Sequence, residues 1–216
     1  MNGPESMNTG FILLAINTVH QAILANEAEL ESLDRAIGDG DHYINIKRGS
    51  TAVIGMHDEL ATMAADAALQ HIGMKLMSTI GGASGLLIAS FFLAMAKTAK
   101  ENGGNTLAQI AAAFASGVEA VKSRGKADAG EKTMLDVLIP VANKFTELTG
   151  LGAMPSAVFA ALKIAAEQGM LATRDMIATK GRAAFLGERS IGHIDAGAKS
   201  AQVMIAAVCD LALKNI

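Results

Sequence analysis

Apolar residues recur at helical spacing over most of the chain. From Thr9 to Leu33 large apolar side chains fall every three or four residues, which predicts one long amphipathic helix. The same period predicts further helices over residues 44–64, 66–80, 86–100, 107–122, 133–149, 155–179 and 198–213. About eight helices joined by mostly short loops are typical of an antiparallel, up-and-down all-α bundle.

Local signals mark several of the helix ends. Thr106 is a predicted N-cap, and Pro155 stands where a first helical turn tolerates proline. Pro140 lies inside a predicted helix and should bend it or remove one backbone hydrogen bond. No strand rich in valine and isoleucine leads into a glycine loop, so a Rossmann domain and a P-loop fold are both disfavoured.

Composition indicates a compact globular protein. With 216 residues, 51% apolar and 18% charged, the chain suits one domain over residues 1–216. A formal net charge of -3 gives no reason to expect a nucleic-acid partner. The one cysteine, Cys209, fits a reducing cytoplasm, and the most apolar window, Leu86–Ala96, is too short to span a membrane. We therefore expect a cytoplasmic protein with no signal peptide and no membrane partner.

The most informative loop follows the first predicted helix. Asp34, Asp39 and Asp41 lie within eight residues, and Gly38 and Gly40 alternate with two of them. Glycine allows such a loop to fold tightly, and carboxylate oxygens suit magnesium, manganese or calcium. The same residues also fit a polar helix–helix loop with a capping aspartate, and the spacing is not that of an EF-hand.

Three other loops carry candidate chemistry. Residues 81–85 open a helix with small side chains, which either admits a phosphate to backbone N–H groups or allows close helix packing. Residues 123–133 offer cations for an anionic ligand, or form a solvated loop. Residues 181–197 are dense in glycine, charge and histidine, which indicates an ordered loop or lid. Together these features predict a magnesium–nucleotide site in a helical protein.

Four segments in order resemble the nucleotide-binding L subunit of dihydroxyacetone kinase, the DhaL family. The matching segments are Leu33-Asp34-Arg35 with Ile37 to His42, Asn45 and Arg48-Gly49; Gly81 to Gly85 with Phe91-Phe92; Ser123 to Ala127 with Lys132-Thr133-Met134 and Asp136; and Lys180 to Ala183 with Leu186 to His193. The resemblance implies a barrel of eight antiparallel amphipathic helices, with a nucleotide bound by the loops at one end.

The resemblance also implies roles for individual residues. Asp34, Asp39 and Asp41 would hold two Mg²⁺ ions, with Asp39 bridging them, and Arg182 would reach the diphosphate of ADP or ATP. The phosphate contacts would come from the segment His42, Tyr43, Ile44 and Asn45 and from Ala83 and Ser84. Gly125 and Met134 would line the adenine pocket, while Asp195, Ala196 and Gly197 would close over the nucleotide.

Two positions depart from the family pattern. Ala196 stands where the family often has proline, which implies a less rigid lid. Tyr43 stands where a small residue is common, and we expect it to restrict the phosphate mouth or stack near it.

The implied activity is phosphoryl transfer to dihydroxyacetone held on a separate K subunit. The unfused length favours a resident ADP that is rephosphorylated by a phosphohistidine M subunit of the phosphotransferase system. Three alternatives remain: an unfused ATP-dependent kinase for a related triose or tetrose, a relative of the fatty-acid kinase nucleotide domain, and a nucleotide-loaded regulatory binding module.

Overall fold

The computed structural model describes residues 7–216, which form ten α-helices and two 3₁₀ helices and contain no strand. The α-helices are α1 (Thr9–Ala25), α2 (Glu27–Ile37), α3 (His42–Ile54), α4 (His57–Leu60), α5 (Ala65–Thr79), α6 (Gly82–Asn102), α7 (Leu107–Gly125), α8 (Leu135–Gly150), α9 (Pro155–Ala172) and α10 (Ala196–Lys214). The 3₁₀ helices are η1 (Thr173–Asp175) and η2 (Ala183–Ser190), both between α9 and α10.

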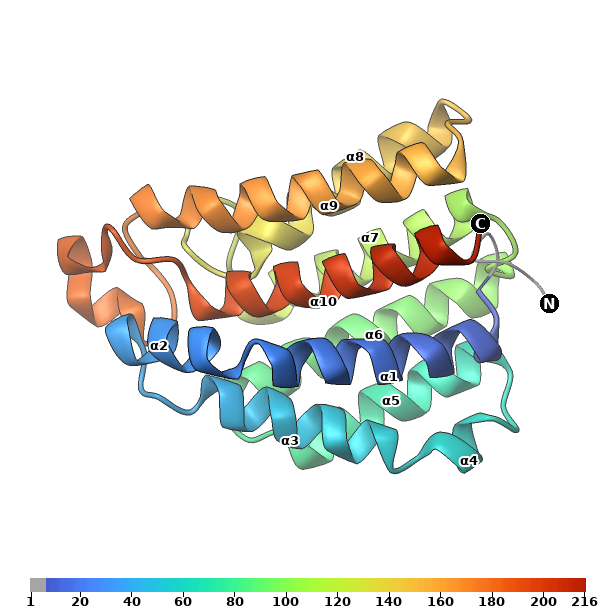
Figure 1. The fold of residues 1–216 in the computed structure, drawn as a ribbon, viewed down its shortest axis with the longest axis horizontal. Coiled ribbons are helices and arrows are strands. Elements are labelled where there is room, and N and C mark those ends of the chain that lie inside the picture. The colour runs from blue at the N-terminus through green and yellow to red at the C-terminus, as the bar shows by residue number, and fades with distance from the viewer. Residues whose placement is uncertain (1–6) are drawn as a thin grey trace.

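Eight of these helices close into a ring. Helix α1 packs on α3, α3 on α5, and α5 on α6; the order continues through α7, α8, α9 and α10, which returns to α1. Neighbours in the ring run antiparallel, and α2 extends past the ring at one end, against α3 and α10 (Figure 1). The predicted all-α barrel of eight antiparallel helices is therefore confirmed.

Antiparallel order brings four connections to the end of the ring opposite the chain termini (Figure 1). These connections are residues 38–41, 80–81, 126–134 and 173–195. We call residues 126–134 the α7–α8 loop and residues 173–195 the α9–α10 segment. The four segments singled out in the sequence all include residues at this end.

Close helix approach depends on residues without side chains at the contact points. A Cβ atom built on Gly169 of α9 would lie 2.3 Å from the carbonyl oxygen of Asp136 in α8. One built on Gly117 of α7 would lie 2.7 Å from the ring of Phe91 in α6. Real Cβ atoms do not approach other heavy atoms this closely, so these glycines set the spacing of α6–α7 and α8–α9.

The first predicted helix is two helices in the structure. The chain bends by 64° between α1 and α2. At the bend, the side-chain amide of Asn26 donates to the carbonyl of Ala22 at 2.8 Å, and its backbone N–H bonds to Ile23 instead of continuing the helix. An asparagine side chain that competes for backbone groups disfavours a helix interior, and the apolar period alone did not reveal this.

Other boundaries differ more modestly. The helix predicted over 44–64 is α3 followed by the single turn α4, and the one predicted to residue 179 ends at Ala172 and passes into η1. The hydroxyl of Thr106 accepts from the N–H of Gln109 at 3.2 Å, so the predicted N-cap is confirmed. Pro155 occupies the first turn of α9, and Pro140 lies within α8 without ending it.

Helix α10 has the length and apolar composition of a membrane span, as does the bent α1–α2 pair taken as one. Within the fold, however, α10 packs against α1, α8 and α9, and its buried residues include Ala198, Ala201 and Val203. Its apolar side is therefore part of the core of the ring.

We expect Gly169→Ala to lower the free energy of unfolding by about 1–3 kcal/mol, because the added methyl group overlaps the backbone of α8. The matched control is Gly150→Ala in the last turn of α8, where a Cβ meets nothing within 4 Å. Urea denaturation of both variants provides the measurement. Equal stability of the two variants would contradict the close α8–α9 contact.

Candidate metal and phosphate site

Three carboxylates converge where α2 gives way to α3. Asp34 lies in the last turn of α2, and Asp39 and Asp41 lie in the following loop; one ligand oxygen from each falls within 4.8 Å of the other two. Asp34 is buried, whereas Asp39 and Asp41 are exposed. The three carboxylates therefore lie close enough together to hold a cation. Three hard oxygen donors at this separation match the ligand chemistry of Mg²⁺.

Backbone groups fix Asp34 in place. Its Oδ2 accepts a hydrogen bond from the N–H of His42 at 3.0 Å, at the positive end of α3. A Cβ atom on Gly38 would lie 1.9 Å from Oδ1 of Asp34, so only glycine leaves room for this carboxylate. The alternation of glycine and aspartate in the sequence thus has a direct steric cause at Gly38.

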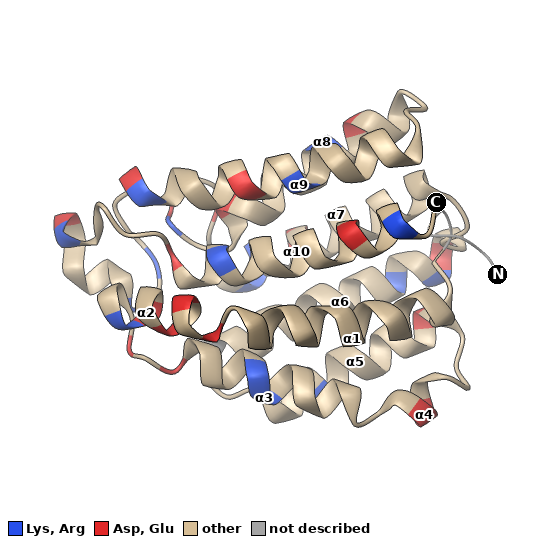
Figure 2. Ribbon diagram, in the orientation of Figure 1, with Lys and Arg blue, Asp and Glu red and all other residues tan. Residues whose placement is uncertain are grey.

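Arg182 joins the aspartates from the α9–α10 segment. Its Nε lies 2.8 Å from Oδ2 of Asp39. The segment is held there because Ile37, at the end of α2, packs against Ala178 and Ala183 on either side of the arginine. Figure 2 shows acidic residues where α2 ends and along the loop that follows it. Arg182 offsets part of this negative charge.

His42 connects the aspartate loop to the start of α10. Its Nε2 lies 3.0 Å from the hydroxyl of Ser200, and this hydroxyl donates to the carbonyl of Gly197 at 2.9 Å. The Ser200 oxygen is therefore left to accept from Nε2. Burial lowers the pKa of His42, and the nearby carboxylates of Asp34, Asp41 and Asp39 oppose this shift.

The other residues of α3 that were predicted to contact phosphates lie in different environments. Tyr43 is buried with Ile23, Leu30 and Ile46 between α1, α2 and α3, so the prediction that its side chain restricts the phosphate mouth is wrong. The aromatic ring is an apolar surface at a position facing the core, which the family pattern did not indicate. Ile44 exposes about half of its side chain, at 52%, and Asn45 is buried in the first turn. For Tyr43 and Ile44, the backbone N–H groups and not the side chains suit a phosphate.

The glycine-rich start of α6 lies at the same end of the ring (Figure 1). Gly81 is the N-cap, and the hydroxyl of Ser84 bonds to the Gly81 carbonyl at 3.4 Å. Ala83 belongs to the first turn of α6, and its side chain lies outside the described residues. Gly125, at the end of α7, faces Leu87 of α6, with 3.3 Å between a built Cβ and the leucine methyl.

The predicted adenine-side and closing residues lie against each other. A Cβ on Gly197 would be 3.6 Å from the backbone nitrogen of Met134. Asp195 is the N-cap of α10 and accepts from the N–H of Ala198 at 2.7 Å. Burial raises the pKa of Asp195 to about 6, and Lys132 opposes the shift. Residues 195–197 are thus the cap and first turn of α10 and not a free loop.

Buried polar residues lie behind the site, and the sequence pattern did not indicate them. Lys132 belongs to a segment predicted to offer cations to a ligand or to solvent, but it is 1% exposed and donates to the carbonyls of Thr173 and His193. Ser190 is fully buried and accepts from the N–H of Ala178 at 3.0 Å. Polar residues in loops are ordinarily expected to face solvent. The one sequence signal for Lys132 was its position within a segment that matches the family.

A protein-family model described as the DAK2 domain matches residues 36–210. The chain belongs to the DAK2 domain family. This match includes Asp39 and Asp41 but begins after Asp34, and it spans the start of α6, the α7–α8 loop and the α9–α10 segment.

Relatives of similar length share much of the sequence. The chain is 41% identical over 185 residues to the PEP-dependent dihydroxyacetone kinase, ADP-binding subunit DhaL, of Escherichia coli (strain K12), covering 85% of this chain and 88% of that protein. It is 40% identical over 181 residues to the PTS-dependent dihydroxyacetone kinase, ADP-binding subunit DhaL, of Lactococcus lactis, covering 84% and 86%. Identity to the triokinase/FMN cyclase of Rattus norvegicus is 31% and covers 92% of this chain but only 34% of that protein.

The fold is also found in a solved structure. The crystal structure of the dihydroxyacetone kinase from C. freundii in complex with AMP-PNP and Mg²⁺ matches 97% of this chain with a TM-score of 0.72. Sequence identity is 21%, and this chain spans 35% of that kinase. This similarity establishes the helical fold.

We expect Gly38→Ala to weaken binding of Mn²⁺, used as a probe for a divalent cation, by about tenfold or more, because the new methyl group displaces the Asp34 carboxylate. The control is Gly55→Ala, where the nearest atom to a built Cβ is 3.5 Å away. Electron paramagnetic resonance titration in the presence of ADP measures free Mn²⁺. Unchanged affinity in Gly38→Ala would remove Asp34 from the metal site.

Proposed function

We propose that this chain is the ADP-binding subunit of a dihydroxyacetone kinase and that it presents a nucleotide phosphate to dihydroxyacetone held on a separate K subunit. The observation that carries the proposal is the pairing of Arg182 with Asp39 inside a cluster of three aspartates. This arrangement provides carboxylates for a cation and a guanidinium for a phosphate at one place. The names and lengths of the relatives from E. coli and L. lactis support the same function.

The carboxylates fit two Mg²⁺ ions in number and type. Asp34, Asp39 and Asp41 would hold them, with Asp39 shared, and the bound ions would neutralise negative charge on the transferring phosphoryl group. The separation of the ligand oxygens, 4.8 Å at most, and the room that Gly38 leaves for Asp34 support this assignment.

The other residues act by position and charge. Arg182 would exchange Asp39 for the diphosphate and hold the phosphoryl group in line. The N-termini of α3 and α6 would direct backbone N–H groups at phosphate oxygens, with Ser84 beside them. His42, held by Ser200, would contact the phosphates, while Gly125, Met134 and residues 195–197 would enclose the base. The reaction then requires alignment and electrostatic stabilisation, and the proposal assigns sugar binding to the K subunit.

We propose phosphoenolpyruvate as the ultimate phosphate donor, through a phosphohistidine M subunit that rephosphorylates a resident ADP. The support is that this chain matches 88% of the E. coli PEP-dependent subunit but only 34% of the rat triokinase/FMN cyclase. We place these steps in the cytoplasm, and the single cysteine, Cys209, which is buried, is compatible with that location.

Acid release of nucleotide from freshly purified protein tests this function first. We expect close to one ADP per chain and about two magnesium ions. Addition of K and M subunits, phosphoenolpyruvate and the phosphotransferase proteins should then phosphorylate dihydroxyacetone, and Asp39→Asn should lower the rate about 100-fold or more. Turnover with ATP, K subunit and sugar alone would replace this proposal with the ATP-dependent kinase, and failure to bind any nucleotide would reject the site.

Phe185 is a candidate contact for the partner subunits. It is 83% exposed in η2, three residues from Arg182, and Ile177 and Ile191 of the same segment are each 44% exposed. A large exposed aromatic next to a site that a second protein must reach is typical of an interface residue.

We expect Phe185→Ser to raise the K-subunit concentration needed for half-maximal sugar phosphorylation by about tenfold, with ADP content unchanged. The control is Leu151→Ser, which removes another largely exposed apolar side chain, 75% exposed, at the opposite end of the ring. Steady-state kinetics with varied K subunit provides the readout. The same response in both variants would exclude a specific role for Phe185.

A further inference from the structure

The α7–α8 loop is fastened to both halves of the α9–α10 segment by two consecutive residues. Glu131 contacts the first half: its Oε1 accepts from the hydroxyl of Thr179 at 3.1 Å and lies 3.6 Å from Nζ of Lys180. The carbonyl of Glu131 also accepts from the N–H of Thr179 at 3.4 Å. These contacts fix the chain two to three residues before Arg182.

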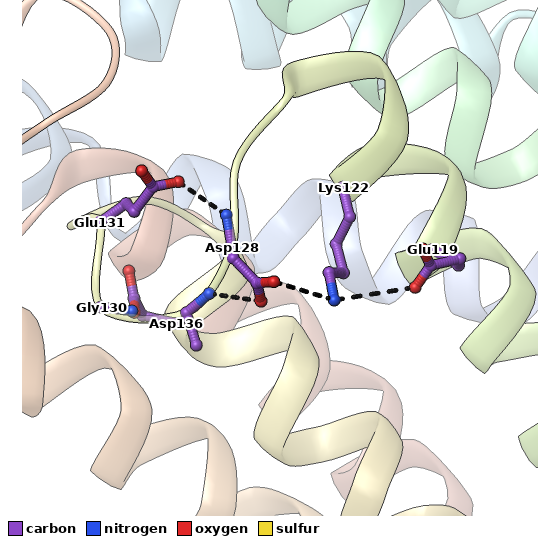
Figure 3. A network of polar contacts seen from close by, with 7 residues as sticks. Glu119, Lys122, Asp128, Gly130, Glu131 and Asp136 are labelled. Atoms are coloured by element: carbon purple, nitrogen blue, oxygen red, sulfur yellow. Dashed lines mark hydrogen bonds and ion pairs between the residues drawn. The ribbon is translucent and has the colours of Figure 1, made fainter.

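Glu131 is itself held from the other side. Its Oε2 accepts from the N–H of Asp128 at 2.7 Å, and the Asp128 carboxylate lies 3.2 Å from Nζ of Lys122 on α7. Lys122 also pairs with Glu119 at 3.8 Å (Figure 3). The contacts of Glu131 therefore connect the α9–α10 segment to a helix of the ring.

Lys132 joins the two ends of the same segment. Its ammonium group donates to the carbonyl of Thr173, in η1, and to the carbonyl of His193, just before α10. The hydroxyl of Thr173 accepts from the N–H of Asp195 at 3.1 Å, which adds a second link between the two ends. Lys132 is thus the residue on which the beginning and the end of the segment converge.

The backbone of Lys132 is in an unfavourable conformation. Its φ of 61° lies in the left-handed region, which a side chain with a Cβ rarely adopts. The carboxylate of Asp136 stabilises this turn by accepting from the N–H groups of Gly130 and Thr133, the latter at 2.7 Å. The strained backbone directs the lysine into the protein instead of toward solvent.

The ammonium group of Lys132 is buried among polar groups. Burial lowers the pKa of Lys132, and the carboxylates of Asp195, Asp175 and Asp136 oppose this shift. Two carbonyl acceptors and three nearby carboxylates form a polar environment that a neutral side chain would leave unsatisfied. A side chain that donates hydrogen bonds to both carbonyls is therefore needed for the arrangement.

We propose that Glu131 and Lys132 are positioning residues that hold the α9–α10 segment over the site, so that Arg182 and residues 195–197 retain their places around a bound nucleotide. Release of the nucleotide then requires these contacts to open. The nucleotide part of this inference rests on the proposed function, whereas the positioning part concerns the protein alone.

Hydrogen exchange of the nucleotide-free protein tests the positioning part. In Lys132→Met we expect peptides within residues 173–195 to exchange about 10- to 100-fold faster, as for the loss of hydrogen bonds to a buried charge, while peptides of α1 and α8 stay unchanged. Lys132→Arg, which keeps the cation, should restore most of the protection. Lys144→Met, which removes an exposed lysine paired with Glu147, is the control.

The dissociation rate of ADP in the presence of Mg²⁺ tests the consequence. We expect Lys132→Met and Glu131→Ala to release ADP about tenfold faster or more, and Lys132→Arg and Lys144→Met to resemble the wild type. Glu131→Ala carries the test if Lys132→Met does not fold, because Glu131 contacts only the first half of the segment.

The inference would be overturned if exchange in Lys132→Met became faster to the same extent in all helices. It would also be overturned if exchange within residues 173–195 stayed unchanged in both Lys132→Met and Glu131→Ala. Local loosening with an unchanged ADP release rate would overturn its functional part. If the wild type binds no ADP, the proposed function fails while the exchange data still decide whether these residues position the segment.

Discussion

Closure of the helices into a ring is the constraint on which the rest of the structure depends. With eight antiparallel helices, every second connection must lie at the same end, so segments far apart in the sequence meet there. The close α6–α7 and α8–α9 contacts at Gly117 and Gly169 set the spacing of these helices. The loops can therefore vary in sequence and carry chemistry while the ring determines their positions.

The site concentrates negative charge, and the structure balances it in two different ways. Asp34 is buried and fixed by the N–H of His42 and by the room that Gly38 leaves, so its position is built into the backbone. Asp39 is paired with Arg182, whose side chain is 72% exposed. An exposed ion pair contributes little to stability, so Arg182 can exchange its partner at small cost. This difference suits a fixed ligand for a cation beside a movable group for an anion.

The sequence indicated the loops that form the site, but not the buried residues and the helix break that position them. The all-α class, the Thr106 cap and the tight aspartate loop depend on local spacing, and the structure contains the helices, the cap and a close cluster of the three carboxylates. The break at Asn26 was missed because one polar side chain competed for backbone groups within an uninterrupted apolar pattern. The side chains of Tyr43 and Lys132 were expected at the site or in solvent, but the direction in which a side chain points depends on the tertiary structure. An aromatic residue beside a polar loop turned into the core, and a lysine in a polar loop became buried through a left-handed backbone.

Lys132 and Arg182 show why charge alone does not reveal function. Both lie in loops at the same end of the ring, and both contribute a cation near carboxylates. Lys132 is enclosed and bonded to two carbonyl groups, so moving it would leave buried charge unpaired. Arg182 lies between two positions of one segment that the α7–α8 loop holds, Thr179 and His193. Because the segment is fixed on both sides of Arg182, the guanidinium can move only within a limited space. Its side chain is exposed, so it can still exchange Asp39 for another anion. Capture of a phosphate beside a metal requires both properties.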